Sequence, residues 1–315
     1  MHQPNAALQR YRILSKLSLP DAQTRFLHAP MPKHLTLQVG DVTVDIQADG
    51  RLPEWDVLPA YRPFLAEAGG EVVLRLHSGV SEIDAGEKIF DSSPIWTLHR
   101  RRDTSVIEIF ENFSGLHNRL VIPHHLTHAD LYFAENGDRF PGPFFGPAME
   151  LLMVNYLARE RGIIVHACGV VHCGKGILFA GESGAGKSTL ARLWDGEANT
   201  DILSDDRIIV RKQGGKFWMY GTPWHGDARF GLPRRIGLDR IFSLRHSREN
   251  SVRKAGQADT VMQLLKCSFP PYWETEGMEF TMDLFGEIAA AVPCHEFHFT
   301  PDRRAIDSIK TRVVL

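Results

Sequence analysis

The sequence is poor in the features that mark several protein classes. Only four of its 315 residues are cysteine, and they are too scattered for a disulfide framework. Reduced thiols are typical of a cytoplasmic protein, which is the compartment we expect. No run of about 18 apolar residues is present, so we predict no membrane-spanning helix. The N-terminal segment also lacks the continuous apolar core of a signal peptide.

The charge balance lacks an excess of either sign. Lys and Arg total 36, Asp and Glu total 38, and the formal net charge is −2. A nucleic-acid-binding protein is usually strongly basic, so we expect no nucleic-acid partner. Apolar residues make up 43% of the chain, which is enough for a packed core. At roughly 150 residues per domain, the length favours two domains.

The first half alternates apolar and polar residues over short runs rich in Val, Ile and Thr. In HLTLQVGDVTVDIQADG, Gly40 and Asp41 predict a turn between two strands. Similar runs continue to about residue 135 and predict a smaller, antiparallel β-rich domain over residues 1–140. A stretch rich in Gly and Pro at 136–147 predicts a linker. This half carries no catalytic motif, and from its position we expect it to serve acceptor recognition or assembly.

A glycine-rich motif in the second half predicts a phosphate-binding loop. GESGAGKST fits G-x-x-x-x-G-K-[ST] at every fixed position, between an expected strand GILFAG and an expected helix from about Lys187 to Trp194. In such loops the backbone amides face phosphate oxygens, the lysine reaches the β- and γ-phosphates, and the hydroxyl of Ser188 would ligate Mg²⁺. The predicted nucleotide-binding residues are Gly181, Glu182, Ser183, Gly184, Ala185, Gly186, Lys187, Ser188 and Thr189.

Two adjacent aspartates, Asp205 and Asp206, lie inside the apolar run ILSDDRIIV. Neighbouring residues of a strand point to opposite faces, unless the strand ends there. Beside a phosphate loop, one carboxylate is expected to hold a metal ion and the other to accept the proton of an attacking hydroxyl. The short distance along the chain from the loop indicates that the two strands are neighbours.

The segment HACGVVHCGKGILFAGESGAGKSTLARLW, followed by ILSDDRIIV, resembles the C-terminal catalytic domain of HPr kinase/phosphorylase. The same core looks like ATP-dependent phosphoenolpyruvate carboxykinase. The resemblance covers about Pro147 to Leu315 and implies an α/β catalytic domain over residues 147–315. It also implies an ATP- and Mg²⁺-dependent kinase that transfers phosphate to a hydroxyl, usually serine, of a peptide or protein acceptor.

Carried across by position, the resemblance implies roles for individual residues. Asp205 would be the general base and Asp206 a metal ligand beside Ser188, with an exchange of the two roles left open. His166 matches the active-site histidine of the family. Relatives often assemble, so the resemblance allows a homo-oligomer.

The sequence also departs from the family. Thr189 stands where the family has glutamate, and the family's loop for reverse phosphorolysis is not recognisable. These departures leave open whether the protein has phosphorylase activity and whether HPr is its substrate. GTPWHGDARFG occupies roughly the region of that loop, and Arg229 within it is a candidate clamp for the transferring phosphate.

Three other functions stay open. A nucleotide-gated binding module would need Lys187 and Ser188 but no catalytic base. A kinase for a small molecule such as free serine would use the same machinery on a different acceptor. A carboxykinase acting on oxaloacetate is disfavoured, because the chain is much shorter than that family and its carboxylate-binding arginines are not identifiable.

Overall fold

The computed structural model describes residues 34–48, 57–67, 69–79, 84–110, 116–133 and 147–313. The chain divides into two units, Met1–Tyr156 and Leu157–Leu315, and each is built around a large sheet. The architecture is mixed α/β. The predicted linker lies outside the described residues apart from Pro147, and the domain limits stay a prediction. Among the described helices, none has the length and apolar character needed to cross a membrane.

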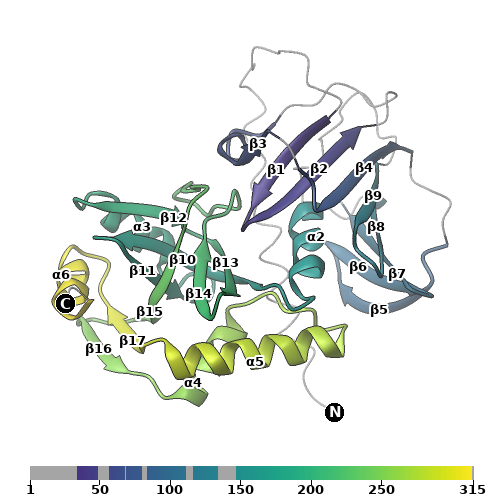
Figure 1. The fold of residues 1–315 in the computed structure, drawn as a ribbon. Helices are drawn as coiled ribbons and strands as arrows, with labels where there is room; N and C mark the ends of the chain where they lie inside the picture. The colour runs from purple at the N-terminus through teal and green to yellow at the C-terminus, as the bar shows by residue number, and fades with distance from the viewer. Residues whose placement is uncertain are drawn as a thin grey trace. The chain divides into compact units, whose positions relative to one another are not determined.

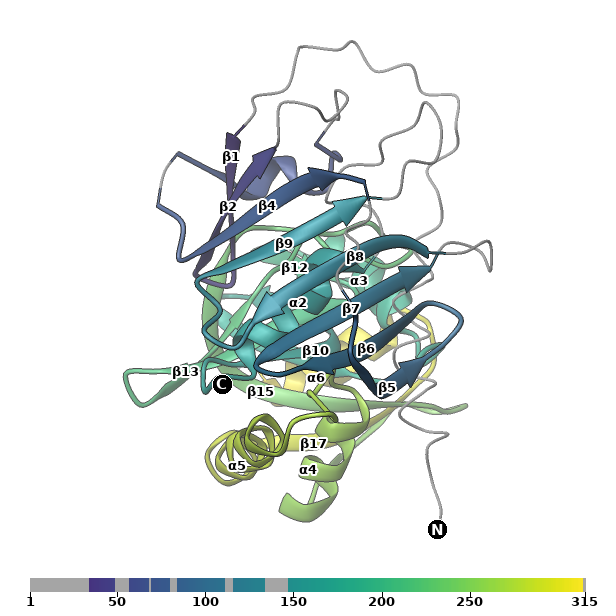
Figure 2. The ribbon, with the colours of Figure 1, turned by 90° about the vertical axis from the view of Figure 1, so that its right-hand side faces the viewer.

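The first unit contains a nine-stranded sheet (Figure 2). Its order is β3-β1-β2-β4-β9-β8-β7-β6-β5. The elements are β1 (His34–Val39), β2 (Val42–Ala48), the 3₁₀ turn η2 (Arg62–Phe64), β3 (Leu65–Ala66), β4 (Val72–Ser78), β5 (Glu87–Ser92), β6 (Trp96–Arg101), β7 (Thr104–Phe110), β8 (Leu116–Pro123), β9 (His128–Phe133) and the helix α2 (Ala148–Leu157). The predicted turn at Gly40 and Asp41 is confirmed between β1 and β2.

The expectation of a wholly antiparallel sheet is wrong at one strand. β4 pairs in parallel with both β2 and β9. Tight hairpins can join only antiparallel neighbours, whereas the long connections from β2 to β4 and from β4 to β9 permit parallel pairing. The period-two pattern still explains the core. Five fully buried, directly paired residues form a row across five strands, namely Leu76, Leu131, Leu120, Ile107 and Leu98.

The second unit contains an eight-stranded sheet with helices (Figure 1). The elements are β10 (Ile163–His172), β11 (Lys175–Ala180), α3 (Lys187–Asp195), β12 (Thr200–Ser204), β13 (Arg207–Gln213), β14 (Lys216–Tyr220), β15 (Arg235–His246), β16 (Ser251–Lys254), α4 (Gln257–Lys266), α5 (Thr275–Ala291), β17 (Cys294–Phe299) and α6 (Arg304–Val313). The order is β11-β10-β13-β14-β15-β17-β16, with β12 beside β10. A further pairing of β11 with β15 closes a circuit through five strands.

Two hydrophobic cores cover the two faces of this sheet. Along β11, Phe179 packs into the core that holds Trp194 of α3 and residues of α6. The next residue back, Leu178, packs into the core that holds Leu264 of α4 and Phe285 of α5. Successive strand residues point to opposite faces, so the continuous apolar run GILFAG is what a strand covered on both sides requires.

Three strands end at the same edge of this sheet. β11, β15 and β17 are parallel, with Ala180 opposite Ser243 and His246 opposite Phe299. The glycine-rich loop leaves the sheet at this edge, directly after Ala180. The carboxyl ends of parallel strands are where α/β sheets commonly bind ligands, so this edge is the place to build the site.

Candidate functional site

Residues 181–186 connect the end of β11 to the start of α3, which confirms the predicted order of strand, loop and helix. Gly186 precedes the helix with φ 94°, a left-handed conformation that is strained for residues with a Cβ. A Cβ there would also lie 2.6 Å from the ring of Phe299. The N–H of Ala185 donates to the carbonyl of Glu182 at 3.0 Å and closes the loop. The loop therefore depends on glycine at its junction with α3.

Lys187 is the first residue of α3 and is 5% exposed. Its Nζ donates to the carbonyls of Gly181 at 2.9 Å and of Glu182 at 3.1 Å. Burial lowers the pKa of Lys187 to about 8, although the negative charge of Asp206 acts in the opposite direction. The ammonium is therefore largely cationic at neutral pH. Together with the positive end of the helix dipole, it makes this loop attractive to an anion.

The predicted strand through the two aspartates is interrupted at Asp205 and Asp206. β12 ends at Ser204 and β13 begins at Arg207. These two residues keep the same register against β10, whereas the earlier residues of β12 are shifted by one residue, between Gly169 and Val170 of β10. The Oγ of Ser204 accepts the backbone N–H groups of Asp206 and Arg207, each at 3.2 Å. Serine stabilises a turn in this way. The break lets the two carboxylates bind different partners.

Asp205 is fully buried and holds the segment 226–230. Its carboxylate accepts the backbone N–H groups of Gly226 at 2.9 Å, Ala228 at 3.0 Å and Phe230 at 3.3 Å. A Cβ on Gly226 would lie 2.7 Å from Oδ2 of Asp205 and 3.0 Å from Oγ of Ser188. The hydroxyl of Ser188 and the carboxylate of Asp205 therefore lie together beside Gly226.

Asp206 has a different environment. Its Oδ1 lies 2.9 Å from Nε2 of His166, and its Oδ2 forms an ion pair with Arg207. Burial alone would raise the pKa of Asp206, but the charge of Arg207, the hydrogen bond from His166 and the charge of Lys187 together hold that pKa well below its usual value. Asp206 is therefore an anion at neutral pH.

His166 lies on β10 and is 4% exposed. Burial, followed by the charge of Lys187, lowers the pKa of His166 to about 4, against the opposing effect of Asp206. The imidazole is neutral at pH 7, and Nε2 carries the hydrogen because the carboxylate can only accept. His166 therefore orients the Asp206 carboxylate without neutralising its charge.

The structure brings the predicted residues together in two groups. Ser188 lies with Asp205, and His166 lies with Asp206. The electrostatic effect of Lys187 on both His166 and Asp206 connects the glycine-rich loop to the second group.

Arg229 is not positioned in either group. It is exposed, with φ 61°, and its side chain forms no hydrogen bond or ion pair with any residue that the structure describes. Its backbone N–H donates to the carbonyl of Gly226 at 3.1 Å. Arg229 thus belongs to the segment held by Asp205, while its guanidinium remains at the surface.

Arg207 and Phe269 were not among the predicted site residues. The guanidinium carbon of Arg207 lies 4.5 Å from the ring centroid of Phe269, and this buried arginine pairs with Asp206. A basic residue inside an apolar strand, directly after two acids, was the available signal for Arg207. Phe269 lies far along the chain, and no local pattern indicates its contact.

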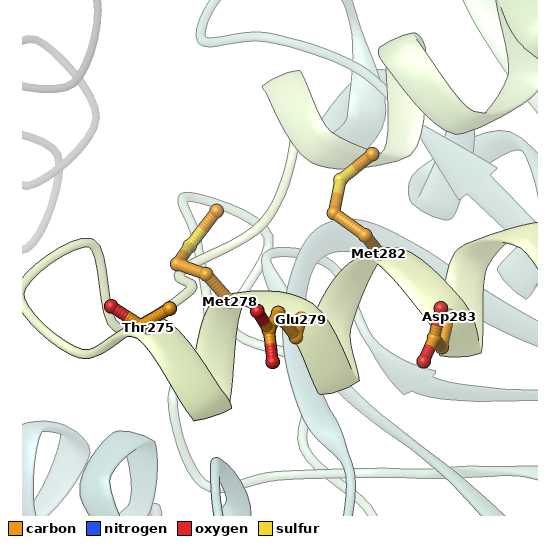
Figure 3. Close-up of a pocket in the computed structure, with 5 residues that line it drawn as sticks. All are labelled: Thr275, Met278, Glu279, Met282 and Asp283. Atoms are coloured by element: carbon orange, nitrogen blue, oxygen red, sulfur yellow. The ribbon is translucent and has the colours of Figure 1, made fainter.

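An open surface pocket of about 480 Å³ lies along α5, and none of its lining residues belongs to the glycine-rich loop (Figure 3). It is lined by Thr275, Met278, Glu279, Met282 and Asp283. These side chains supply two carboxylates, two thioethers, one hydroxyl and no cation. The pocket is therefore chemically unsuited to a polyphosphate, and the site described above rests on its hydrogen bonds and charges.

Comparisons with known proteins add little. No protein-family model matches the chain, and no curated protein matches it. Among solved structures, the chain is similar to the HPr(Ser) kinase/phosphatase from Coxiella burnetii, with a TM-score of 0.28 and 15% identity over 48% of this chain and 88% of that chain. At this low similarity, neither the fold nor the activity of that protein is transferred to this chain.

Proposed function

We propose that this protein is a Mg²⁺-dependent kinase that transfers the γ-phosphate of ATP to a hydroxyl group. The observation that carries the proposal concerns Asp206. Its carboxylate is ionised and partly accessible, and it lies within electrostatic reach of Lys187, the residue directly after the glycine-rich loop. A module that only binds a nucleotide has no need for a carboxylate oriented by a buried histidine. Phosphoryl transfer to a hydroxyl uses a carboxylate in that place.

The nucleotide phosphates would lie on residues 181–189. Lys187 now donates to two loop carbonyls, and phosphate oxygens would provide stronger, charged acceptors for the same ammonium. The start of α3 adds backbone N–H groups that have no partner within the helix. These parts neutralise and orient the phosphates, which is most of what phosphoryl transfer requires from a protein.

Ser188 and Asp205 are the residues that fit Mg²⁺. Both offer oxygen, the donor that Mg²⁺ prefers, and both lie beside Gly226. Among the described residues, no group of three or more His, Cys, Asp or Glu side chains is arranged to hold a metal ion. Magnesium in nucleotide sites usually takes one or two protein oxygens together with phosphates and waters, so two residues are sufficient. When bound, the ion would neutralise phosphate charge.

We assign the role of general base to Asp206 and the role of magnesium ligand to Asp205. This exchanges the roles first expected for the two aspartates, an alternative that the sequence left open. The oxygens of Asp205 are occupied by three backbone N–H groups and are fully buried. The oxygens of Asp206 also have partners, neutral His166 on Oδ1 and Arg207 on Oδ2, but its side chain is 21% exposed. Only Asp206 is accessible to an incoming hydroxyl.

In the proposed reaction, the acceptor oxygen forms a bond to the γ-phosphorus while the bond from that phosphorus to the bridging oxygen breaks. ADP leaves, and the hydroxyl proton moves to an oxygen of Asp206. The low pKa of Asp206 makes it a weak base. In a loose phosphoryl-transfer transition state the hydroxyl proton leaves late, so a weak base is sufficient once His166 has oriented it.

The acceptor class follows only from the sequence resemblance, which implies a peptide or protein hydroxyl. Arg229 as a phosphate clamp also stays a prediction. To test the function, purified protein with Mg²⁺ and γ-labelled ATP is added to host lysate, which is then separated into peptides and small molecules. We expect label on a discrete hydroxyl acceptor. Tight ATP binding without transferred label would support the nucleotide-gated module instead.

A further inference from the structure

The end of β15 reaches beyond β11 to the glycine-rich loop. Ala180, the last residue of β11, pairs with Ser243, and β15 continues to His246. The Nε2 atom of His246 lies 2.6 Å from the carbonyl oxygen of Gly184. A carbonyl oxygen can only accept, so Nε2 carries the hydrogen and donates it.

The His246 ring is held in place by β17. It stacks on Phe299, its partner in the parallel pair, with ring centroids 5.9 Å apart and an interplanar angle of 23°. Phe299 is fully buried, and the N–H of Ser247 donates to its carbonyl at 3.1 Å. The Asn250 side chain then accepts the N–H of Thr300 at 2.9 Å. The chain on both sides of His246 is therefore fixed.

Gly184 has one further tie, through the Ala185 N–H of its peptide, which donates to the carbonyl of Glu182 at 3.0 Å. It is exposed, with φ 83°, and a Cβ there would meet nothing within 4 Å. Glycine in open space can rotate its peptide plane at little cost. The peptide is planar and trans, so the bond from His246 to the Gly184 carbonyl and the bond from the Ala185 N–H to Glu182 hold the same plane from its two ends.

We propose that His246 is a positioning residue that holds the Gly184 carbonyl away from the bound polyphosphate. The negative end of that carbonyl would otherwise be able to turn toward the phosphates. This inference rests on the proposed function, because it concerns the same loop. The proposal gives His246 a role in nucleotide binding, although this residue lies outside the glycine-rich motif and far from it in the sequence.

The test uses calorimetric titration of the full-length protein with Mg·ATP and, separately, with Mg²⁺ and tripolyphosphate. His246→Phe keeps an aromatic ring for Phe299 but has no donor, whereas His246→Gln retains one. His298→Gln removes another imidazole of the same edge of the sheet and serves as the control. Thermal unfolding of each variant checks that it is folded.

We expect His246→Phe to weaken both ligands by a similar factor of about five to ten, the value of one hydrogen bond. His246→Gln should recover most of that affinity, and the transfer rate at saturating ATP should stay unchanged. Equal affinities of the wild type and His246→Phe for both ligands would overturn the inference. A loss of affinity for ATP alone, with tripolyphosphate binding unchanged, would also overturn it, because His246 would then contact the adenine ring of the nucleotide. If the wild-type protein bound neither ligand, the proposed function itself would fall.

Discussion

His166 and Asp206 are joined by a hydrogen bond of 2.9 Å between Nε2 and Oδ1, which connects β10 to the break between β12 and β13. The pKa of His166 is lowered to about 4, and that of Asp206 is held well below its usual value. A neutral donor therefore faces an anionic acceptor throughout the neutral range. The carboxylate stays ionised and oriented, as the proposed base must be.

Asp206→Asn should remove transfer while leaving binding in place. Asparagine keeps the size of the side chain but cannot take up the hydroxyl proton, so the transfer rate should fall roughly 10²- to 10⁴-fold. The residues that we assign to the phosphates are untouched. Calorimetry with Mg·ATP and single-turnover transfer on the same preparation would separate the two effects. A variant that lost ATP affinity in proportion to its rate would argue against this role.

Asp205→Asn should behave differently, because Asp205 supports the segment 226–230. An amide presents an NH₂ group where the carboxylate now accepts backbone N–H groups, so at least one buried donor loses its partner. We expect a loss of about 1–3 kcal/mol in the free energy of unfolding, measured by urea denaturation. An unchanged urea midpoint would show that these three bonds do not support the fold.

Gly226→Ala should disturb the place where Ser188 and Asp205 meet. The added Cβ would be 2.7 Å from the carboxylate and 3.0 Å from the hydroxyl, too close for either to keep its position. We expect about a tenfold lower apparent affinity for Mg²⁺ in the transfer assay, the size of effect expected when one oriented hydrogen bond is lost. Gly237→Ala is the matched control, since a Cβ there meets nothing within 4 Å. Equal Mg²⁺ dependence in the two variants would contradict the site.

The buried Lys187 makes stability depend on pH. Its pKa falls from 10.5 to about 8 on folding, so between these values the unfolded chain binds more protons at this group. The free energy of unfolding should therefore rise with pH from about 8 to 10.5, at up to about 1.4 kcal/mol per pH unit. Urea denaturation across this range, with Lys187→Met as the reference, isolates the effect. If the difference in the free energy of unfolding between the two proteins did not change with pH, a depressed pKa of Lys187 would be contradicted.

Two glycines of α5 should respond in opposite ways to alanine. Gly286 is exposed inside the helix, and a Cβ there meets nothing within 4 Å, so Gly286→Ala should stabilise by about 0.5–1 kcal/mol. At Gly277 a Cβ would lie 2.5 Å from Pro271, so Gly277→Ala should destabilise. Thermal unfolding would measure both. Stabilisation by both changes would mean that the start of α5 can move away from Pro271.

Local patterns predicted much of this fold. The turn at Gly40 and Asp41 and the helix that begins at Lys187 needed only neighbouring residues, because turn chemistry and helix starts act over a few positions. The break at Asp205 and Asp206 was not predicted, because it depends on Ser204 and on where β10 pairs. The parallel pairing of β4 likewise depends on the whole sheet.

The candidate site was predicted only in part, for the same reason. The motif residues and the two aspartates are close in sequence and could be found there. The contact of Arg207 with Phe269 and that of His246 with Gly184 join positions far apart in the chain. Which of the two carboxylates is accessible was also undecided, because burial and backbone partners distinguish them and their adjacent positions in the sequence do not.

The central claim is tested most directly by transfer of label from γ-labelled ATP to the acceptor found in host lysate, measured for the wild type and for Asp206→Asn at matched ATP occupancy. The account predicts stoichiometric label on an acceptor hydroxyl with the wild type and almost none with the variant. Transfer by Asp206→Asn at the wild-type rate would contradict it.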